Sequence, residues 1–186
     1  YPQGIAVDSS GNIYVADVSN DVIRRMDANG NNITTLGSGF DSPFGVAVDS
    51  SGNIYVADTY NYLIKRMDAS GNNITTLGSD FLMPFGIAVD SSGNIYVADT
   101  YNHVIKRMDA SGNNITELGS DFLMPYGVAV DSSGNIYVAD TDNNAIKRMD
   151  ASGNNIITLG SGFNEPCGVV VDSSGNIYVA DTDNNA

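Results

Sequence analysis

Aspartate is the residue type that this sequence offers most regularly for chemistry. Asp8, Asp17 and Asp27 each recur at a constant interval of 41 residues, and rows of carboxylates could bind calcium, which prefers oxygen ligands. The segments "DSSGN" and "DASGNN" lack the D-x-[DN]-x-[DN]-G spacing of a calcium loop. Aspartate at a turn or a strand end commonly accepts backbone N–H groups. We therefore predict structural caps, no metal site and no cofactor, with a metal on a central axis as the open alternative.

Groups suited to catalysis are scarce. His103 is the only histidine, whereas imidazole-rich metal sites need several, and a Ser-His-Asp triad would depend on it without any G-x-S-x-G turn. Cys167 is the only cysteine, so the chain forms no internal disulfide. Its position in the other copies holds Gln3, Phe44, Phe85 and Tyr126, which indicates loop variation rather than a nucleophile. We predict that the chain is not an enzyme.

Basic residues form four adjacent pairs. Neighbours in a strand point to opposite faces, so we expect each pair to meet carboxylates between neighbouring units rather than to form a basic patch. The formal net charge of −14 would repel nucleic acids and anionic membrane surfaces. No apolar run reaches the roughly 18 residues of a membrane helix, so we expect no membrane insertion. The pairs are Arg24 and Arg25, Lys65 and Arg66, Lys106 and Arg107, and Lys147 and Arg148.

The whole chain is one tandem array. The stretch "DSSGNIYVAD" begins at residues 8, 49, 90, 131 and 172 without a single change. A repeat of 41 residues gives the 186-residue chain about four and a half units. Repeat units of this length stack on one another and bury a continuous core. We therefore treat residues 1–186 as a single domain.

Each repeat contains four predicted strands and no helix. In the first unit they cover residues 4–8, 12–17, 22–27 and 32–37, with turn residues between them. The first two are nearly continuous apolar runs, the third is half polar and the fourth is rich in threonine. This gradient predicts an antiparallel sheet whose first strand lies at the centre of a ring. The predicted fold is all-β, a β-propeller of four-stranded blades.

The repeat resembles a known family. The pattern P-x-G-[IV]-[AV]-V-D-S-S-G-N-I-Y-V-A-D-T-x-N-x-x-I, as in residues 84–105, is similar to the NHL repeat and recurs in register along the chain. Propellers of this family usually have six blades, which implies that the chain is part of a larger array. The family includes RNA-binding members with basic surfaces, a branch that the acidic charge disfavours. The resemblance also suggests a bacterial protein that is secreted or located on the cell surface.

Blade limits follow from the repeat interval. The last unit stops after its second predicted strand, so its outer strands are absent from the sequence. We expect the open blade faces at the two ends to be available for association. The predicted blades are 1–41, 42–82, 83–123 and 124–164, followed by a half blade at 165–186.

The copies differ mainly on one side of the predicted ring. The turns between the second and third strands and the blade-to-blade segments, such as 59–62 and 78–84, lie on one side, which we name the crossover rim. The turns within the other two hairpins, such as 49–53 and 68–72, form the opposite hairpin rim. "DSSGN" never changes, whereas the crossover turns read "VSNDV", "TYNYL", "TYNHV" and "TDNNA". Nearly all non-conservative divergence therefore lies on the crossover rim.

The divergent positions predict a binding surface. They carry aromatic and apolar residues of the kinds enriched at interfaces, and drift alone should also have changed the hairpin rim. We predict a non-catalytic recognition or scaffolding module for a protein, peptide or glycan; the alternative is part of a metal-dependent propeller lyase or hydrolase completed by other blades. The predicted rim residues are Tyr60, Tyr62, Tyr101, His103, Phe44, Phe85, Tyr126, Leu82, Met83, Leu123 and Met124.

Overall fold

The described part of the chain forms four antiparallel four-stranded sheets and one two-stranded sheet. A computed structural model describes residues 1–184, and the last two residues of the predicted half blade 165–186 lie outside this range. Within every four-stranded sheet the spatial order of the strands is their chain order. The prediction of an all-β propeller with antiparallel four-stranded blades is confirmed.

The strands have nearly the same bounds in every repeat. The first blade contains β1 (Pro2–Val7), β2 (Ile13–Asp17), β3 (Val22–Met26) and β4 (Thr34–Leu36). The second contains β5 (Pro43–Val48), β6 (Ile54–Asp58), β7 (Leu63–Met67) and β8 (Thr75–Leu77). The third contains β9 (Pro84–Val89), β10 (Ile95–Asp99), β11 (Val104–Met108) and β12 (Thr116–Leu118). The fourth contains β13 (Pro125–Val130), β14 (Ile136–Asp140), β15 (Ala145–Met149) and β16 (Ile157–Leu159), and β17 (Pro166–Val171) and β18 (Ile177–Asp181) follow.

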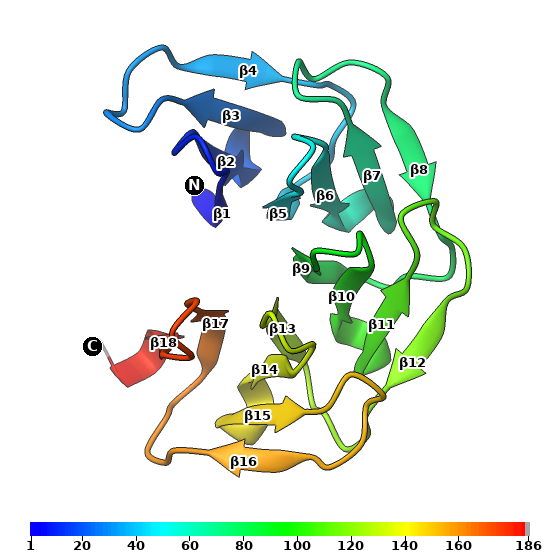
Figure 1. Ribbon diagram of the computed structural model, residues 1–186, viewed down its shortest axis with the longest axis vertical. Helices are drawn as coiled ribbons and strands as arrows, with labels where there is room; N and C mark the ends of the chain where they lie inside the picture. Colours follow the sequence, from blue (N-terminus) through cyan, green and yellow to red (C-terminus); the bar gives the residue numbers. More distant parts are fainter. Residues whose placement is uncertain (185–186) are drawn as a thin grey trace.

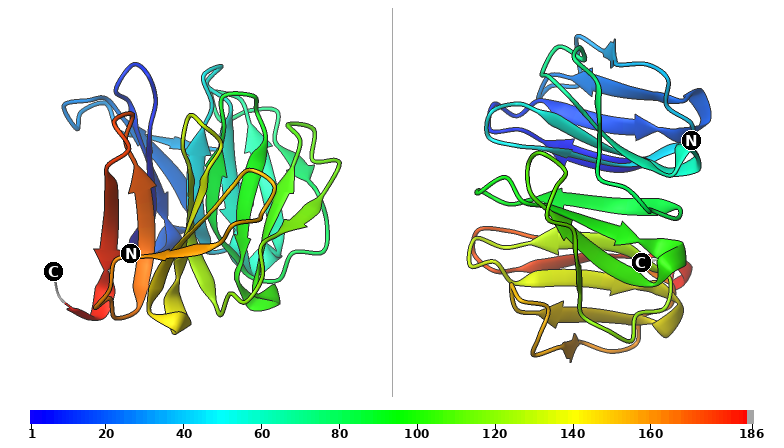
Figure 2. Two further views of the ribbon diagram at one scale, coloured as in Figure 1. Left: turned by 60° about the horizontal axis from the view of Figure 1, so that its bottom comes forward. Right: turned by 90° about the vertical axis from the view of Figure 1, so that its right-hand side faces the viewer.

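The blades surround a central axis. The first strands β1, β5, β9, β13 and β17 lie innermost, and β4, β8, β12 and β16 lie at the periphery (Figure 1). Loops gather at the two opposite ends of the strands (Figure 2), where they form the hairpin rim and the crossover rim. Each first strand packs beside the first strand of the next blade. The residues that differ between the copies in the blade-to-blade segments therefore lie close together at one end of the central axis, on the crossover rim.

Two local features differ from the sequence expectation. Each first strand begins at its proline, as β1 does at Pro2, because the residue after the proline is accommodated as a bulge. A single 3₁₀ turn follows each second strand, at Val18–Asn20 in the first blade and at equivalent places in the others. These are η1 (Val18–Asn20), η2 (Thr59–Asn61), η3 (Thr100–Asn102), η4 (Thr141–Asn143) and η5 (Thr182–Asn184).

The core lies between blades rather than inside any one blade. In β6, Tyr55 and Ala57 pack toward the third blade, whereas Ile54 and Val56 pack toward the first. All five residues of β6, β10 and β14 are buried. Burial therefore peaks at the second strand and falls toward the fourth, whose first two residues are exposed in each four-stranded blade. The first strands are less covered because one of their edges faces the open axis.

The two end faces have no neighbouring blade. Val7 of the first blade is 60% exposed, and Tyr178 of the last sheet is 58% exposed although the equivalent Tyr96 is only 2% exposed. In Figure 1 these ends face one another across an open sector of the ring. Each uncovered face has the same pattern of apolar residues as the faces that pack between interior blades. No helix among the described residues has the length and apolar character needed to span a membrane.

Candidate functional site

A row of aromatic side chains marks the inner edge of the crossover rim. The rings of Phe44 and Phe85 are 4.4 Å apart between centroids in an edge-on arrangement, and those of Phe85 and Tyr126 are stacked at 4.7 Å. Both separations are in the range of favourable aromatic pairs. The three residues come from three successive blades. The row therefore joins blades two, three and four into one continuous aromatic surface.

The glycine after each of these positions produces the close spacing. A Cβ atom on Gly45 would collide with the carbonyl oxygen of Phe85, and one on Gly86 would collide with that of Tyr126. Glycine therefore lets neighbouring first strands approach through their backbones at this end. The bulge between Pro43 and Gly45 leaves the intervening residue outside the regular ladder. The motif P-x-G thus places the variable residue x of each blade next to the residue x of the neighbouring blade.

The two ends of this row are not aromatic. Gln3 occupies the position in the first blade, and Cys167 occupies it in the last sheet, where the Thr182 hydroxyl donates to its sulfur at 2.8 Å. Cys167 is a half-buried free thiol. The aromatic surface is therefore restricted to the middle three blades.

Exposed apolar side chains surround the row. Tyr60, Tyr62 and Tyr101 lie on the 3₁₀ turns or just after them and are about half exposed, and Leu82 and Leu123 on the crossover segments are similarly exposed. Met83 and Met124, next to these leucines, are half-buried. A turn and a crossover segment are adjacent because the Tyr101 N–H donates to the Leu82 carbonyl at 3.2 Å. All the predicted rim residues thus lie on the same side of the ring, and their role in binding stays a prediction.

His103 and Tyr62 share a strained backbone position. The residue that ends each 3₁₀ turn has a left-handed conformation, with φ of 53° at Asp21, 59° at Tyr62, 58° at His103 and 51° at Asn144. Aspartate and asparagine tolerate this region better than other non-glycine residues do. The side chain of Asn144 accepts the Glu165 N–H at 2.8 Å. His103 acts in the same way, since its Nδ1 accepts the Met124 N–H at 3.0 Å.

Tyr62 does not compensate for this strain. A phenol ring has no acceptor placed near its own backbone, and Tyr62 forms no side-chain hydrogen bond within the described residues. Its ring is 48% exposed. A bulky residue held at positive φ without a side-chain hydrogen bond is uncommon and suggests a function. Among the residues that end the 3₁₀ turns of the four complete blades, Tyr62 is therefore the one whose presence stability explains least.

A buried ion pair supports each crossover segment from below. Asp99 and Lys106 are almost fully buried, and the Lys106 Nζ lies 2.7 Å from an Asp99 carboxylate oxygen. The other oxygen of Asp99 accepts the Leu82 N–H at 2.7 Å, and Lys106 also donates to the Asp80 carbonyl at 2.6 Å. The Lys106 ammonium lies 5.2 Å from the centre of the Phe81 ring, within cation–π range. The same arrangement occurs in the second and fourth blades, at Lys65 with Asp58 and Lys147 with Asp140.

The basic pairs are therefore used differently from the sequence expectation. We expected ion pairs between blades, but among the described residues the lysine ion pairs lie within a blade, on the aspartate that ends the second strand. The second member of the pair does reach the next blade, where Arg66 donates to the Ala110 carbonyl at 3.3 Å. Arg107 does the same to Ala151 at 3.2 Å. The inter-blade partner of these two arginines is thus a backbone carbonyl rather than a carboxylate.

The hairpin rim is closed by its own aspartates. One oxygen of Asp49 accepts the N–H groups of Ser51 and Asn53 at 2.9 Å, and the other accepts the side chains of Asn53 and Tyr55. Although burial opposes ionisation, these bonds, those from Asn53 above all, hold the pKa of Asp49 below its usual value. Burial and then the bond to Asp49 raise the pKa of Tyr55 to about 12. The prediction that these aspartates act as caps is confirmed.

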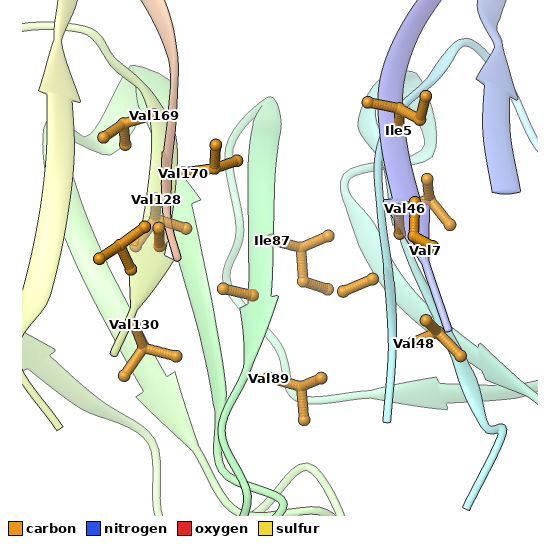
Figure 3. A pocket seen from close by; sticks show the side chains of 15 residues that line it. Ile5, Val7, Val46, Val48, Ile87, Val89, Val128, Val130, Val169 and Val170 are labelled. Carbon is orange, nitrogen blue, oxygen red and sulfur yellow. The ribbon is translucent and has the colours of Figure 1, made fainter. Parts of the chain in front are cut away.

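No group of three or more His, Cys, Asp or Glu side chains that could hold a metal ion occurs within residues 1–184. Along the axis, the first strands enclose an open hollow of about 350 Å³. Its side chains are apolar and include Ile5, Val46, Ile87 and Val130 (Figure 3). The side chains that line this hollow are all Ile, Val or Ala, so they include no ligand for a cation.

The crossover rim also carries carboxylates, which are not among the rim residues predicted from the sequence. Asp142 and Glu165 are exposed and lie near the aromatic row. The pKa of Tyr126 is raised, first by burial and then by the negative charges of its neighbours, which include Asp142 and Glu165. The comparison of copies could have found them, because the tyrosines at 60 and 101 become aspartate at 142 and the methionines at 83 and 124 become glutamate at 165. The predicted rim set was restricted mainly to aromatic and apolar residues, so these two acidic residues were not included in it.

Comparison with known families explains the repeat. The model of the NHL repeat matches residues 1–21, 40–67, 81–107, 122–149 and 163–186. The chain belongs to the NHL-repeat family. The matched segments cover every blade and include the P-x-G motif, the second strand and the aspartate that ends it. The family resemblance seen in the sequence is confirmed.

Solved structures share the fold of this NHL-repeat chain. A chain from the crystal structure of a nidogen/laminin complex superimposes with a TM-score of 0.91 at 24% identity, over 99% of this chain and 73% of that chain. Virginiamycin B lyase from Staphylococcus aureus has a TM-score of 0.79 at 20% identity, over 97% and 63%. A streptogramin B lyase has a TM-score of 0.75 at 18% identity, over 97% and 68%. A search of curated proteins gives no significant match. At these identities the similarity establishes the propeller fold alone.

Proposed function

We propose that this NHL propeller is a non-catalytic recognition module that binds a protein partner through its crossover rim. The aromatic row of Phe44, Phe85 and Tyr126 carries this proposal, together with the exposed tyrosines and leucines around it. Aromatic residues supply large contact areas at protein interfaces and lose little conformational entropy when they bind. The hairpin rim offers no comparable surface, because its polar groups are saturated by their own turn.

The distribution of strain supports the same surface. Tyr62 has a left-handed backbone without a compensating hydrogen bond, whereas other blades place Asp21, His103 or Asn144 there and form one. Tyrosine is less stabilising at this position than asparagine or aspartate would be. A less stabilising residue is expected where the side chain is needed for binding. One structural neighbour is a chain in a nidogen/laminin complex, which is consistent with a protein as partner. Two other structural neighbours are lyases.

A selection experiment tests the proposal and does not require an identified partner. The folded protein is immobilised and used to enrich binding peptides from a random displayed library. The enriched peptides are then measured against a rim variant with Tyr60, Tyr62 and Tyr101 replaced by serine, and against a control variant with Ser50→Tyr and Ser91→Tyr on the hairpin rim. We expect binding to be lost in the rim variant and retained in the control. Loss in the control alone would show that the wrong face has been chosen.

A further inference from the structure

The crossover rim is acidic as well as aromatic. Among residues 1–184, the side-chain ion pairs all involve the aspartates that end second strands. The exposed carboxylates of the rim therefore have no cationic partner in the described chain. These are Asp21, Asp41, Asp80, Asp121, Asp142, Glu165 and Asp183.

None of the protein's basic residues is free to neutralise them. Arg24 and the three lysines are bound to strand-end aspartates. The second residue of each pair lies opposite the tyrosine of the second strand, as Arg66 lies opposite Tyr55, and this tyrosine bonds to the hairpin rim. The rim carboxylates thus lie in a region of uncompensated negative potential, within a chain whose formal charge is −14.

The interior of the same protein shows how this combination binds a cation. Lys106 is held between the carboxylate of Asp99, the ring of Phe81 and a crossover carbonyl. On the surface, Tyr126 brings together an aromatic face and the nearby charges of Asp142 and Glu165. An aromatic ring attracts an ammonium or guanidinium group placed over its face. The rim therefore repeats, in a partly exposed position, the groups that the blade uses to hold its own lysine.

We propose that the crossover rim binds an extended basic segment of a partner protein, whose arginine or lysine side chains pack on the Tyr126 ring, at the end of the aromatic row, beside Asp142 and Glu165. This inference rests on the proposed function and adds the chemistry of the partner. The apolar residues between the charges, such as Leu82 and Leu123, contact the uncharged side chains of the segment. Carboxylates from several blades then steer the encounter and fix its register.

Three labelled synthetic peptides of equal length test the charge preference directly. One alternates arginine with leucine, the second alternates glutamate with leucine, and the third alternates arginine with serine. By fluorescence anisotropy we expect the arginine–leucine peptide to bind in a salt-dependent manner, the glutamate–leucine peptide not to bind, and the arginine–serine peptide to bind about tenfold more weakly because apolar contacts are lost. Equal binding of the first two peptides would overturn the inference.

A matched pair of variants separates the rim from the overall charge. Glu165→Gln removes one charge from the crossover rim, and Glu117→Gln removes the same charge from the exposed outer strand β12. We expect the first to weaken binding of the arginine–leucine peptide about fivefold and the second to leave it unchanged. Equal weakening by both would mean attraction to the net charge alone and would also overturn the inference. Selected peptides that depend on the rim but are not basic would leave the proposed function intact and reject only this chemistry.

Discussion

At the scale of single residues, one backbone conformation recurs in every complete blade, and the side chain at that position stabilises it in some blades and not in another. The left-handed residue after each 3₁₀ turn is Asp21, Tyr62, His103 or Asn144 in the four complete blades. Three of these side chains accept an N–H group from the following crossover segment. Only the Tyr62 side chain accepts none, which makes it the candidate among these four for contact with the proposed partner.

Tyr62→Asn should therefore stabilise the protein. Asparagine tolerates positive φ, and its side chain can accept the Met83 N–H as Asn144 accepts that of Glu165. We expect a gain of about 1 kcal/mol in the free energy of unfolding, measured by chemical denaturation, together with weaker binding of rim-dependent peptides. The control is Tyr60→Asn, which lies inside the 3₁₀ turn and should not stabilise the fold. A loss of stability on Tyr62→Asn would argue against strain at this position.

Tyrosine ionisation provides a second test at this scale. The pKa of Tyr55 and that of Tyr96 are raised to about 12, mainly by burial and also by the nearby Asp49 and Asp90. A raised folded-state pKa means that stability is fully present below the unfolded value of 10.0 and is lost as the pH rises toward 12. We expect unfolding in chaotrope to become progressively easier over this interval. Tyr55→Phe and Tyr96→Phe together should reduce that pH dependence, and an unchanged alkaline profile would contradict the assignment.

At the scale of secondary-structure elements, contact between first strands determines how the blades associate. Glycine in the P-x-G motif lets the backbone of one first strand touch the next, and the same approach stacks the variable side chains. The inter-blade core then forms from residues that alternate between the two faces of the second strand. The aromatic row and the packing of the blades thus depend on the same backbone geometry.

Gly45→Ala should be costly for this reason. The added Cβ would meet the Phe85 carbonyl, so two backbones would have to separate, and overpacking of this kind costs about 2 kcal/mol or more. Gly168→Ala is the matched control, because at the same motif position in the last sheet the added Cβ would meet only the Ala180 methyl at 3.4 Å. We expect the control to change the free energy of unfolding by less than about 0.5 kcal/mol. Similar losses from the two substitutions would show that close approach is not what the motif requires.

At the scale of the whole molecule, stability is shared between neighbouring blades. Each interior face is covered by the next blade, whereas the outer faces of the first blade and the last sheet are uncovered. In arrays of this kind stability is approximately the sum of unit terms and neighbour contacts. The same residue should then contribute differently according to its place in the array.

Substitution of the second-strand tyrosine in two different blades tests whether stability depends on contact with a neighbouring blade. Tyr96→Ser removes a side chain that is 2% exposed, and we expect a loss of about 3 kcal/mol or more. Tyr178→Ser changes the equivalent residue on the open face, which is 58% exposed, and should cost less than about 1 kcal/mol. Both values come from denaturation of the purified chain at several protein concentrations. A large, concentration-dependent loss at Tyr178 would instead indicate that this face is covered by association between chains.

The sequence alone determined the fold, because each repeat carries its own strands, turns and caps. The invariant "DSSGN" contains the donors and acceptors that close its hairpin, so that local order needs no information from other blades. The strand pattern and the interval of 41 residues then require units that pack face to face. The division into two rims followed from antiparallel connectivity, and the variable residues could be assigned to one of them.

Only the tertiary structure decided which of those residues meet. Stacking of Phe85 on Tyr126 joins positions 41 residues apart, and it depends on a backbone contact at Gly86 that no local pattern reveals. The lysine ion pairs turned inward to the strand-end aspartates, which left the rim carboxylates without cations. A sequence lists charges and rings but not their separations, and both Coulomb attraction and ring stacking depend on distance. The acidic and aromatic character of the crossover rim is therefore a property of the assembled ring.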